Sequence, residues 1–208
     1  FKNDVDWLGI KYEKIVFASD YMKTYYELAE KLIKQKDAYI CACSQEKISK
    51  LRGERKRCKC FESSVEENLV GFKSMQTKAE PESITLRLVG DMESNNTTLL
   101  DPVIFRVIIT PHYRQGKKYR CWPVYDFDSP ITDSLLGVTH MMRSKEYELR
   151  DELYLLILDK LGMKKPIIYD FSRLVLKGTI LSKRKLKPLI DNKLVMGWDD
   201  PRMPTIAG

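Results

Sequence analysis

Two closely spaced pairs of cysteines constrain the fold of this chain more than any other feature of its sequence. They are Cys41-Ala42-Cys43 and Cys58-Lys59-Cys60, and a short segment separates them. Two thiolates on each of two tight turns can converge on four tetrahedral corners, which is the geometry that zinc requires. Disulfides and free buried thiols are the alternatives, but a Cys-x-Cys pair cannot close an unstrained bridge within itself. We therefore predict a structural zinc site, because four protein ligands leave no open position for catalysis; the fifth cysteine, Cys121, is expected in the core.

The segment around these cysteines is strongly basic. One acidic residue, Glu54, stands among the cations Lys47, Lys50, Arg52, Arg55, Lys56, Arg57 and Lys59. Over the whole chain, 36 lysines and arginines against 29 aspartates and glutamates give a net charge of +7. This excess favours an anionic partner such as nucleic acid or a nucleotide, although many basic proteins bind no anion specifically. The clustering predicts a positive patch beside the cysteines.

The composition is that of a folded chain without membrane segments. Of its 208 residues, 43% are hydrophobic and 31% are charged, so a sizeable core can form. No uncharged apolar run approaches the roughly 18 residues of a membrane helix, and the first residues show no signal-peptide pattern. We expect a soluble, cytoplasmic protein with no membrane partner.

Periodicity and capping residues predict helices in the first part of the chain and one long helix near its end. They are a helix capped at Ser19 or Asp20 that continues through Ile33, a helix starting at Ser44, a helix with the capping box Ser64 and Glu67, and a helix over Tyr147–Leu161 stopped by Gly162.

Short apolar or alternating runs predict strands between these helices. They are Tyr39–Cys41, Ile84–Leu88, Val103–Ile109, Tyr119–Val124 after a turn at Arg114–Lys117, Val138–Arg143, Ile167–Tyr169 and Leu174–Leu176. Val103–Ile109 and Val138–Arg143 are expected to be buried. Residues 39–122 thus read as an inserted α+β module, and the last third reads as a nucleotide-binding α/β half.

The run Leu181-Ser182-Lys183-Arg184-Lys185 follows the last predicted strand and offers a hydroxyl and clustered cations on a mobile loop. Such a loop suits polyphosphates, because lysine and arginine stabilise charge on nonbridging oxygens and on a leaving pyrophosphate. Taken alone, such a charge run favours a solvated basic loop.

This run resembles the second signature motif of class I aminoacyl-tRNA synthetases, in the form found in the glutamyl and glutaminyl enzymes. Other segments resemble the same family in its order: Ser19-Asp20-Tyr21, Asp101–Arg106, Trp122–Phe127, Gly137–Arg143 and Gly197–Arg202. The resemblance spans essentially the whole chain. It implies an α/β fold, the Rossmann-like catalytic domain of a class I synthetase, with an inserted α+β module that binds the acceptor stem.

The resemblance also implies a division of the chain into four segments. These are 1–38 as the remainder of a first Rossmann half, 39–122 as the zinc-bearing acceptor-binding module, 123–178 as the second Rossmann half, and 179–208 as the signature loop with the start of a stem-contact region. No segment matches the family's histidine-glycine signature, so we expect a fragment of a catalytic core, incomplete at its N-terminus and inactive or nearly so by itself.

Fewer residues distinguish glutamate from glutamine as the amino acid. Leu135–His140 with Arg143 and then Lys145-Glu146 resembles the archaeal-type glutamyl enzymes, and glutaminyl enzymes usually lack that arginine. The double Cys-x-Cys also resembles the zinc site of many glutamyl enzymes. The resemblance therefore favours glutamate.

For the amino-acid pocket, the resemblance implies Tyr125, Ser129 and Arg143 as lining residues, the guanidinium pairing with a substrate carboxylate. Ser129 departs from the asparagine of bacterial members. Without the resemblance, Tyr125 reads as a core aromatic, and Arg143 reads as the ion-pair partner of Glu146 or Asp126.

For the nucleotide, the resemblance implies that Lys183 binds phosphate, with Ser182 and Arg184 completing the catalytic motif. Leu174 and Val175 resemble the strand on which adenine rests, and a core role is the alternative for both. ATP as a substrate and Mg²⁺ as its companion ion follow from the same resemblance.

For the tRNA, the resemblance implies Arg202 as a phosphate contact, whereas Asp199, Asp200 and Pro201 are also compatible with an ordinary turn. The two histidines, His112 and His140, are too few for a metal cluster and are expected to be structural or hydrogen-bonding residues.

The implied function is ATP-dependent ligation of L-glutamate to tRNA(Glu) through a glutamyl-adenylate, with charging of tRNA(Gln) left open. Two alternatives remain at this stage. One is a glutaminyl-tRNA synthetase, and the other is a noncatalytic, zinc-braced tRNA-binding module derived from the same fold.

Overall fold

The computed structural model describes residues 2–172 and 177–205. The chain forms two compact units, residues 17–172 and residues 1–16 with 173–208, and each is described by itself. Among the described helices, none has both the length and the apolar character needed to cross a membrane.

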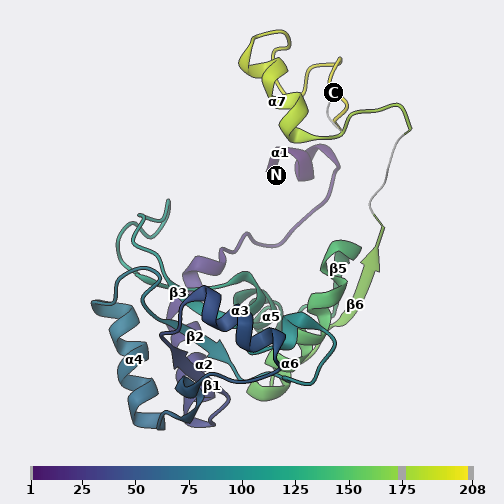
Figure 1. Ribbon diagram of the computed structural model, residues 1–208. Helices are drawn as coiled ribbons and strands as arrows, with labels where there is room; N and C mark the ends of the chain where they lie inside the picture. The colour runs from purple at the N-terminus through teal and green to yellow at the C-terminus, as the bar shows by residue number, and fades with distance from the viewer. Residues whose placement is uncertain (1, 173–176, 206–208) are drawn as a thin grey trace. The chain divides into compact units, whose positions relative to one another are not determined.

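A four-stranded antiparallel sheet lies at the centre of the larger unit (Figure 1). Its order is β1-β2-β3-β4, with bounds Ala38–Cys41, Thr85–Leu88, Val103–Val107 and Cys121–Pro123. In the register, Ile40 lies opposite Leu86 and Leu86 opposite Phe105. The predicted strands in this stretch are confirmed, although β3 ends before Ile109, which is exposed.

The side chains of β1 alternate between two hydrophobic clusters, as the pleat of a strand requires. Ala38 and Ile40 face the main core, where helices α2 (Met22–Lys34) and α4 (Val65–Thr77) pack on β1 and on each other. Tyr39 and Cys41 face a smaller cluster that includes Ile48 of α3 (Gln45–Gly53). One short strand therefore connects the main core to the cysteine region.

Fully buried large side chains fill the main core and come from both helices and strands. They include Tyr25, Leu32, Phe72, Met75, Leu86, Ile104, Phe105, Phe127 and Ile131. Phe105 makes tilted or edge contacts with Phe72 and Phe127, at centroid distances of 5.3 and 5.0 Å. These contacts join α4, β3 and α5 (Tyr125–Leu135) in one core.

The predicted helix starts are confirmed at α3 and α4, whereas the cap predicted at Ser19 or Asp20 is wrong, because both residues lie in a 3₁₀ turn and α2 begins at Met22 after Tyr21. The Ser44 side chain accepts a hydrogen bond from the Lys47 backbone, and Ser64 and Glu67 form the reciprocal capping box. Short 3₁₀ helices connect the regular elements at Ala18–Tyr21, Lys59–Glu62, Thr97–Leu99 and Lys145–Arg150.

Helices α5 and α6 (Asp151–Leu161) pack together beside the sheet. Helix α5 was not predicted, because Pro130 lies in its interior and masks the helical signal. The helix predicted from Tyr147 becomes a true α-helix only at Asp151, after the 3₁₀ turn that ends at Arg150. It ends as predicted at Gly162, whose φ of 66° lies in the left-handed region.

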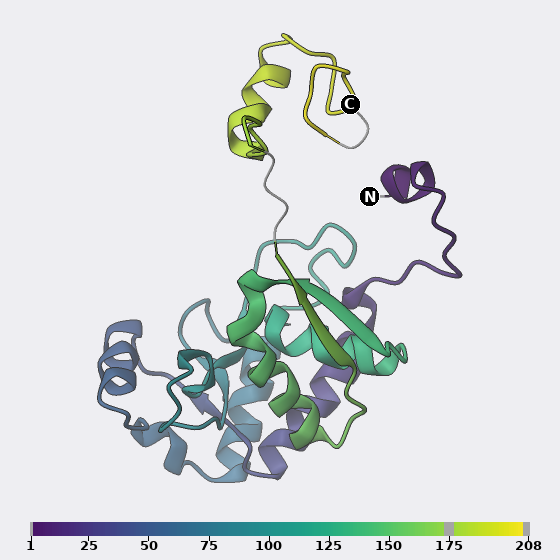
Figure 2. The same cartoon turned by 90° about the vertical axis from the view of Figure 1, so that its right-hand side faces the viewer.

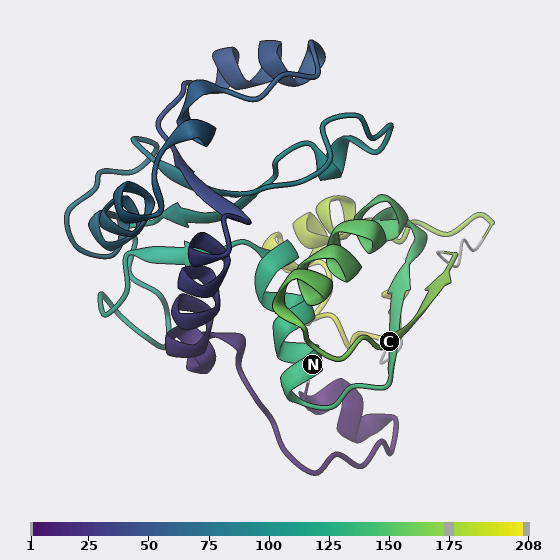
Figure 3. The same ribbon diagram turned by 90° about the horizontal axis from the view of Figure 1, so that it is seen from below.

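Two parallel strands, β5 (His140–Ser144) and β6 (Ile167–Phe171), form a second sheet beside α6 (Figures 2 and 3). The prediction that the strand Val138–Arg143 is buried is wrong. In the observed strand β5, Arg143 is the only buried residue. Among the described residues β5 and β6 pair only with each other. On one face of this two-stranded sheet, the side chains of Met142, Tyr169 and Phe171 are consequently exposed.

The smaller unit contains α1 (Lys2–Trp7) and α7 (Lys183–Asp191). A small cluster of Leu186, Val195 and Met203 holds its C-terminal part together. The signature run, residues 181–185, was predicted to be a mobile loop. This prediction is wrong for Lys183–Lys185, which form the first turn of α7. Leu186, Leu189 and Ile190 give this segment an apolar side at helical spacing, and that side is the one buried. The four-segment division of the chain stays a prediction.

Candidate metal centre, arginine pocket and amino-acid site

The four paired cysteines converge in the larger unit. The Sγ atoms of Cys41 and Cys58 lie 3.7 Å apart, and those of Cys43 and Cys60 lie 3.8 Å apart. All four Sγ atoms lie within 4.8 Å of one another. Cys41 is the last residue of β1 and Cys43 follows it, whereas Cys58 is the N-cap of the 3₁₀ helix Lys59–Glu62 and Cys60 lies within that helix.

This thiol cluster fits a tetrahedral zinc ion. With zinc–sulfur bonds of about 2.3 Å, the sulfur–sulfur edges of a tetrahedron are about 3.8 Å long. Burial and the neighbouring Cys60 raise the pKa of the Cys43 thiol to about 12, so this thiol stays protonated unless a cation stabilises its thiolate. The donor set and its spacing therefore suit a structural metal centre, and none of the four cysteines forms a disulfide.

A buried aspartate holds the cysteine segments in place. Asp101, which is 4% exposed, accepts hydrogen bonds from the Tyr39 hydroxyl at 3.0 Å, from Arg57 Nε at 3.0 Å and from the Gly90 backbone at 2.9 Å. Tyr39 precedes the first cysteine pair and Arg57 directly precedes Cys58. At Gly90 only glycine fits, because an added Cβ would lie 1.8 Å from the carbonyl oxygen of Leu99. Asp101 thereby connects three segments that are distant in sequence.

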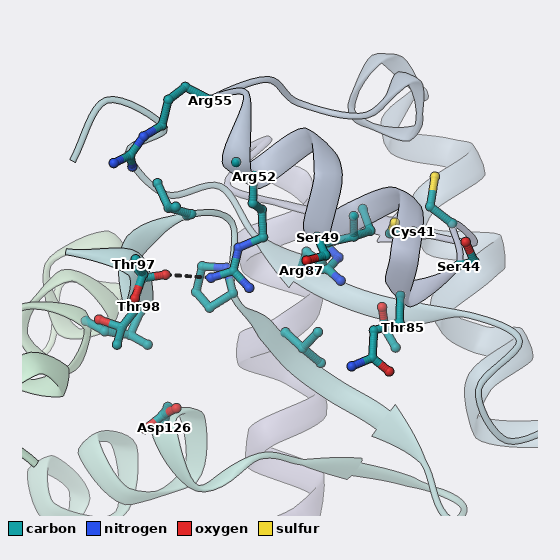
Figure 4. A pocket seen from close by; sticks show the side chains of 18 of the residues that line it. Cys41, Ser44, Ser49, Arg52, Arg55, Thr85, Arg87, Thr97, Thr98 and Asp126 are labelled. Atoms are coloured by element: carbon teal, nitrogen blue, oxygen red, sulfur yellow. Dashed lines mark hydrogen bonds between the residues drawn. The ribbon is translucent and has the colours of Figure 1, made fainter. Parts of the chain in front are cut away.

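A pocket of about 1110 Å³ opens beside the cysteine region (Figure 4). Helix α3, strand β2, the turn at Thr97–Leu99 and the starts of α5 and α6 provide its walls. The polar and charged lining residues include Ser44, Ser49, Arg52, Arg55, Thr85, Arg87, Thr97, Thr98, Asp126 and Arg150. A volume of this order accommodates a nucleotide-sized group.

Four arginines and two acidic residues line this pocket, and two of the arginines, Arg52 and Arg87, lie close to each other. Arg52 donates to the carbonyl oxygen of Thr97 at 2.5 Å, and Arg87 donates to that of Asp101 at 2.8 Å. Arg87 is 9% exposed, and its buried Nε has no partner among the described residues. Burial and the nearby Arg87 charge lower the pKa of Arg52, so the two cations lie close enough to repel each other. An anion between them would relieve that repulsion.

A second polar site surrounds Arg143 on β5. Its Nη1 donates to Asp151 Oδ1 at 3.0 Å, and its side chain is 7% exposed. The guanidinium carbon lies 5.9, 4.9 and 5.5 Å from the ring centroids of Tyr125, Tyr147 and Tyr154. The structure thus brings Tyr125 and Arg143 together, as expected for a shared site. Tyr125 is half exposed and is not a core aromatic.

The ion-pair partners first considered for Arg143 are wrong. Its partner is Asp151, whereas Asp126 pairs with Arg150. Ser129 lies four residues after Tyr125 on α5, so the two share one side of that helix, and Ser129 is half buried. The role assigned to Ser129 stays a prediction.

The signature residues lie in the smaller unit. Ser182 is the N-cap of α7 and makes no capping side-chain bond, and Lys183 and Arg184 are exposed in its first turn. Free N–H groups at a helix start and two cations form a site that suits phosphate. Leu174 and Val175 lie outside the described residues, so their predicted contact with adenine stays a prediction.

Arg202 is engaged with its neighbour Asp200. The Nε–H group of Arg202 donates a hydrogen bond to Oδ1 of Asp200 at 2.9 Å, and the Nη2 group donates one to Oδ2 at 2.8 Å. Asp200 also accepts a hydrogen bond from the Met196 backbone N–H. These hydrogen bonds, that from Arg202 first, hold the pKa of Asp200 well below its usual range. The turn interpretation of this segment is therefore realised, and a phosphate contact by Arg202 stays a prediction.

Both histidines make local contacts of the expected kind. His112 Nδ1 accepts from the backbones of Arg114 and Gln115, and its ring stacks on Trp122. His140 hydrogen-bonds to Thr139.

Comparison with known proteins places this chain in a family. The profile "tRNA synthetases class I (E and Q), catalytic domain" matches residues 1–208. The chain belongs to this family. Its fold is that of the class I synthetase catalytic domain, as the solved structure of a glutamate tRNA ligase from Elizabethkingia meningosepticum CCUG26117 in complex with its amino acid also indicates. That structure covers 89% of this chain and 41% of its own, with a TM-score of 0.56 and 17% identity.

Curated members of the class I synthetase family are similar along the whole chain. The glutamate–tRNA ligase of Cenarchaeum symbiosum (strain A) is 44% identical over 207 residues, which is 100% of this chain and 37% of that protein. That of Nitrosopumilus maritimus (strain SCM1) is 47% identical over 99% of this chain and 36% of its own length. The glutamine–tRNA ligase of Saccharomyces cerevisiae is 40% identical over 99% of this chain and 27% of its own length. This chain therefore spans little more than a third of the archaeal synthetases.

Sequence reasoning missed three residues of these synthetase sites. Arg87 stands in an apolar strand and gave no signal as a pocket residue, and Asp101 was noted only as part of a family segment. Asp151 was hidden inside a predicted helix, where an acidic residue is unremarkable. Arg52 was found only as one member of the basic cluster.

Proposed function

We propose that the protein containing this chain ligates L-glutamate to tRNA(Glu) through a glutamyl-adenylate formed from ATP. The observation that carries the proposal is the buried Arg143 guanidinium, which lies against Tyr125 in a member of the glutamate and glutamine family. A partly desolvated guanidinium favours a carboxylate over a neutral amide, because the Coulomb attraction is strong at low effective dielectric. Glutamate therefore fits better than glutamine.

In this proposal Tyr125 and Arg143 hold the amino-acid side chain, and the role of Ser129 is to line the same pocket from α5. Arg143 provides donors in fork geometry, and the Tyr125 ring covers the guanidinium from the half-exposed side. The two glutamate–tRNA ligases from archaea support this assignment at the level of the whole chain.

The arginine pocket is proposed as the place where the acceptor end of the tRNA contacts the larger unit. Arg52 and Arg87 would bind phosphate there, and Thr97 and Thr98 offer hydroxyls to sugar or phosphate. The cysteine cluster, with zinc bound as a structural ion, would fix α3 and so the pocket wall. Arg202 is proposed as a further tRNA contact through its exposed side chain. Whether tRNA(Gln) is also charged is left to experiment.

For the nucleotide, Lys183 is proposed to bind the phosphates of ATP from the start of α7, with Ser182 and Arg184 beside it. Magnesium would accompany ATP and neutralise its phosphates. Adenine would rest on Leu174 and Val175. Lys183 would stabilise the charge that develops on the departing pyrophosphate more than it stabilises bound ATP. A cytoplasmic location, predicted from sequence, accords with this role.

The test is pyrophosphate exchange by the full-length enzyme with glutamate and with glutamine, followed by charging of each tRNA. Exchange that depends on glutamate supports the proposal. Exchange that depends on glutamine identifies a glutaminyl enzyme, which the yeast relative makes the main alternative. No exchange with either amino acid, together with binding of tRNA, identifies a noncatalytic RNA-binding protein.

A further inference from the structure

Asp151 is the nearest charged partner of Arg143, and its place is fixed by secondary structure. Arg143 lies on β5, and Asp151 is the first residue of α6, after the 3₁₀ turn Lys145–Arg150. The Nη1–Oδ1 distance is 3.0 Å, and the Asp151 side chain is 19% exposed. A carboxylate in the first turn of a helix is also stabilised by the helix dipole. Asp151 is therefore anchored independently of any substrate.

The contact between the two residues leaves most of the arginine available. A guanidinium has five N–H donors, and Asp151 is recorded as accepting from one of them. The rings of Tyr147 and Tyr154, at 4.9 and 5.5 Å, limit the rotation of the remaining group. Asp151 and the neighbouring tyrosines hold the guanidinium while leaving donors for a second carboxylate.

A second acidic residue, Asp170, completes this arrangement. It lies on β6 directly in register with Arg143, and its Oδ1 is buried without a partner among the described residues. Burial, and after it a hydrogen bond and charge repulsion from Asp170, raise the pKa of Asp151, while Arg143 lowers it. Asp170 therefore lies beside the Arg143–Asp151 pair.

We propose that Asp151 is a positioning residue of the amino-acid site, where its carboxylate orients Arg143 so that the free N–H donors meet the side-chain carboxylate of an acidic amino-acid substrate. This inference rests on the proposed function, because it takes Arg143 as the residue that binds the substrate. Asp151 itself touches Arg143 and not the substrate.

Two physical effects of removing the Asp151 charge oppose each other, and the experiment separates them. If Asp151 acts only through its charge, Asp151→Asn leaves the positive charge of Arg143 less compensated, and the KM for glutamate falls. If Asp151 orients Arg143, the fork is lost, and the KM for glutamate rises by roughly tenfold, the usual scale for one charge-assisted hydrogen bond. Orientation is what the Asp151 contact and the confining rings predict.

The measurement is pyrophosphate exchange by the full-length enzyme, with KM for glutamate, KM for ATP and kcat determined separately. For Asp151→Asn we expect the KM for glutamate to rise roughly tenfold while the KM for ATP stays within twofold. Asp151→Glu keeps the carboxylate and is expected to recover most of the affinity. The matched control is Glu148→Gln, an exposed acid on the connecting turn whose side chain has no hydrogen bond or ion pair within residues 2–172 and 177–205.

Three results would overturn the inference. They are an unchanged or lowered KM for glutamate in Asp151→Asn, a parallel rise in the KM for ATP with a lowered melting temperature, or an equal rise in Glu148→Gln. The wild-type enzyme decides the proposed function first. If it shows no glutamate-dependent exchange, that function fails, whereas a glutamate-dependent wild type with an unaffected Asp151→Asn variant refutes only the positioning role.

Discussion

Arg57 Nε donates to Asp101 Oδ2 at 3.0 Å, and this ion pair joins the residue before Cys58 to the residue before Pro102 at the start of β3. The Asp101 carboxylate is 5% exposed and the Arg57 side chain 30%. Asp101 also has a φ of 42°, an unusual value for a residue other than glycine. The contacts of this carboxylate hold a strained backbone between the metal centre and the sheet.

Replacing Asp101 by alanine should destabilise the larger unit by about 3 kcal/mol. The change leaves Arg57, Tyr39 and the Gly90 N–H without their acceptor in a buried place, which costs more than the pair itself contributes. Urea unfolding at neutral pH measures the effect. Glu93→Gln, an exposed acid in the same loop region, should change stability by less than about 0.5 kcal/mol. Equal stabilities of the two variants would contradict the role of Asp101.

The cysteine cluster should hold one zinc ion per chain. Elemental analysis of the purified protein should find it, and Cys43→Ser should reduce the zinc content and lower the melting temperature, because a tetrahedral structural site needs all four ligands. Cys121→Ala removes a buried cysteine outside the cluster and should retain the full zinc content. Purified wild-type protein that contains no zinc would refute the metal centre.

Asp128 should make the protein less stable as the pH rises from about 4 to about 7. Burial, the largest cause, raises the pKa of Asp128 from its ordinary value to about 7. Between about pH 4 and 7 the folded state keeps a proton that the unfolded state has released, so the free energy of unfolding falls as pH rises through this window.

Asp128→Asn removes this titration. The variant should gain up to about 4 kcal/mol over the wild type at pH 8, and the difference should disappear near pH 4. Denaturant unfolding at the two pH values tests it, with Asp126→Asn as the comparison because Asp126 pairs with Arg150 and should lose stability when changed. A difference between wild type and Asp128→Asn that does not depend on pH would exclude this origin.

Arg52→Gln should weaken binding of the tRNA acceptor end by roughly tenfold and reduce the dependence of binding on salt, because one phosphate contact is lost. The KM for tRNA in aminoacylation by the full-length enzyme measures this, with the KM for glutamate unchanged. Lys73→Gln is the matched control, since it removes a cation from the exposed side of α4. If both variants weaken binding equally, the pocket has no special part in it.

Lys183→Ala in the full-length enzyme should lower kcat for pyrophosphate exchange by about a hundredfold or more, with a smaller change in the KM for ATP. The lysine is assigned to charge that appears in the transition state, so its loss raises the barrier more than it weakens ground-state binding. Lys187→Ala, which breaks an exposed pair with Asp191 on the same helix, should leave kcat nearly unchanged. Unchanged exchange in Lys183→Ala would show that the assignment is wrong.

Local sequence signals predicted most of the helices and strands, because each depends on residues that are near one another in the chain. The capping box of Ser64 and Glu67, the left-handed Gly162 and the β-branched run of β3 are examples. The prediction failed where local and tertiary preferences disagree. Pro130 opposes a helix locally, yet α5 forms around it because Phe127 and Ile131 are buried in the main core.

The sequence by itself determined the family, the convergence of the four cysteines and the meeting of Tyr125 with Arg143. Paired cysteines on short turns have few ways to be arranged, so their spacing was sufficient. Only the tertiary structure decided that Arg143 pairs with Asp151 and lies in register with Asp170, that Arg52 approaches Arg87, and that Asp101 links β1 to the second cysteine pair. These contacts join segments whose distances depend on the packing of strands and helices, and no local pattern of residues encodes such distances.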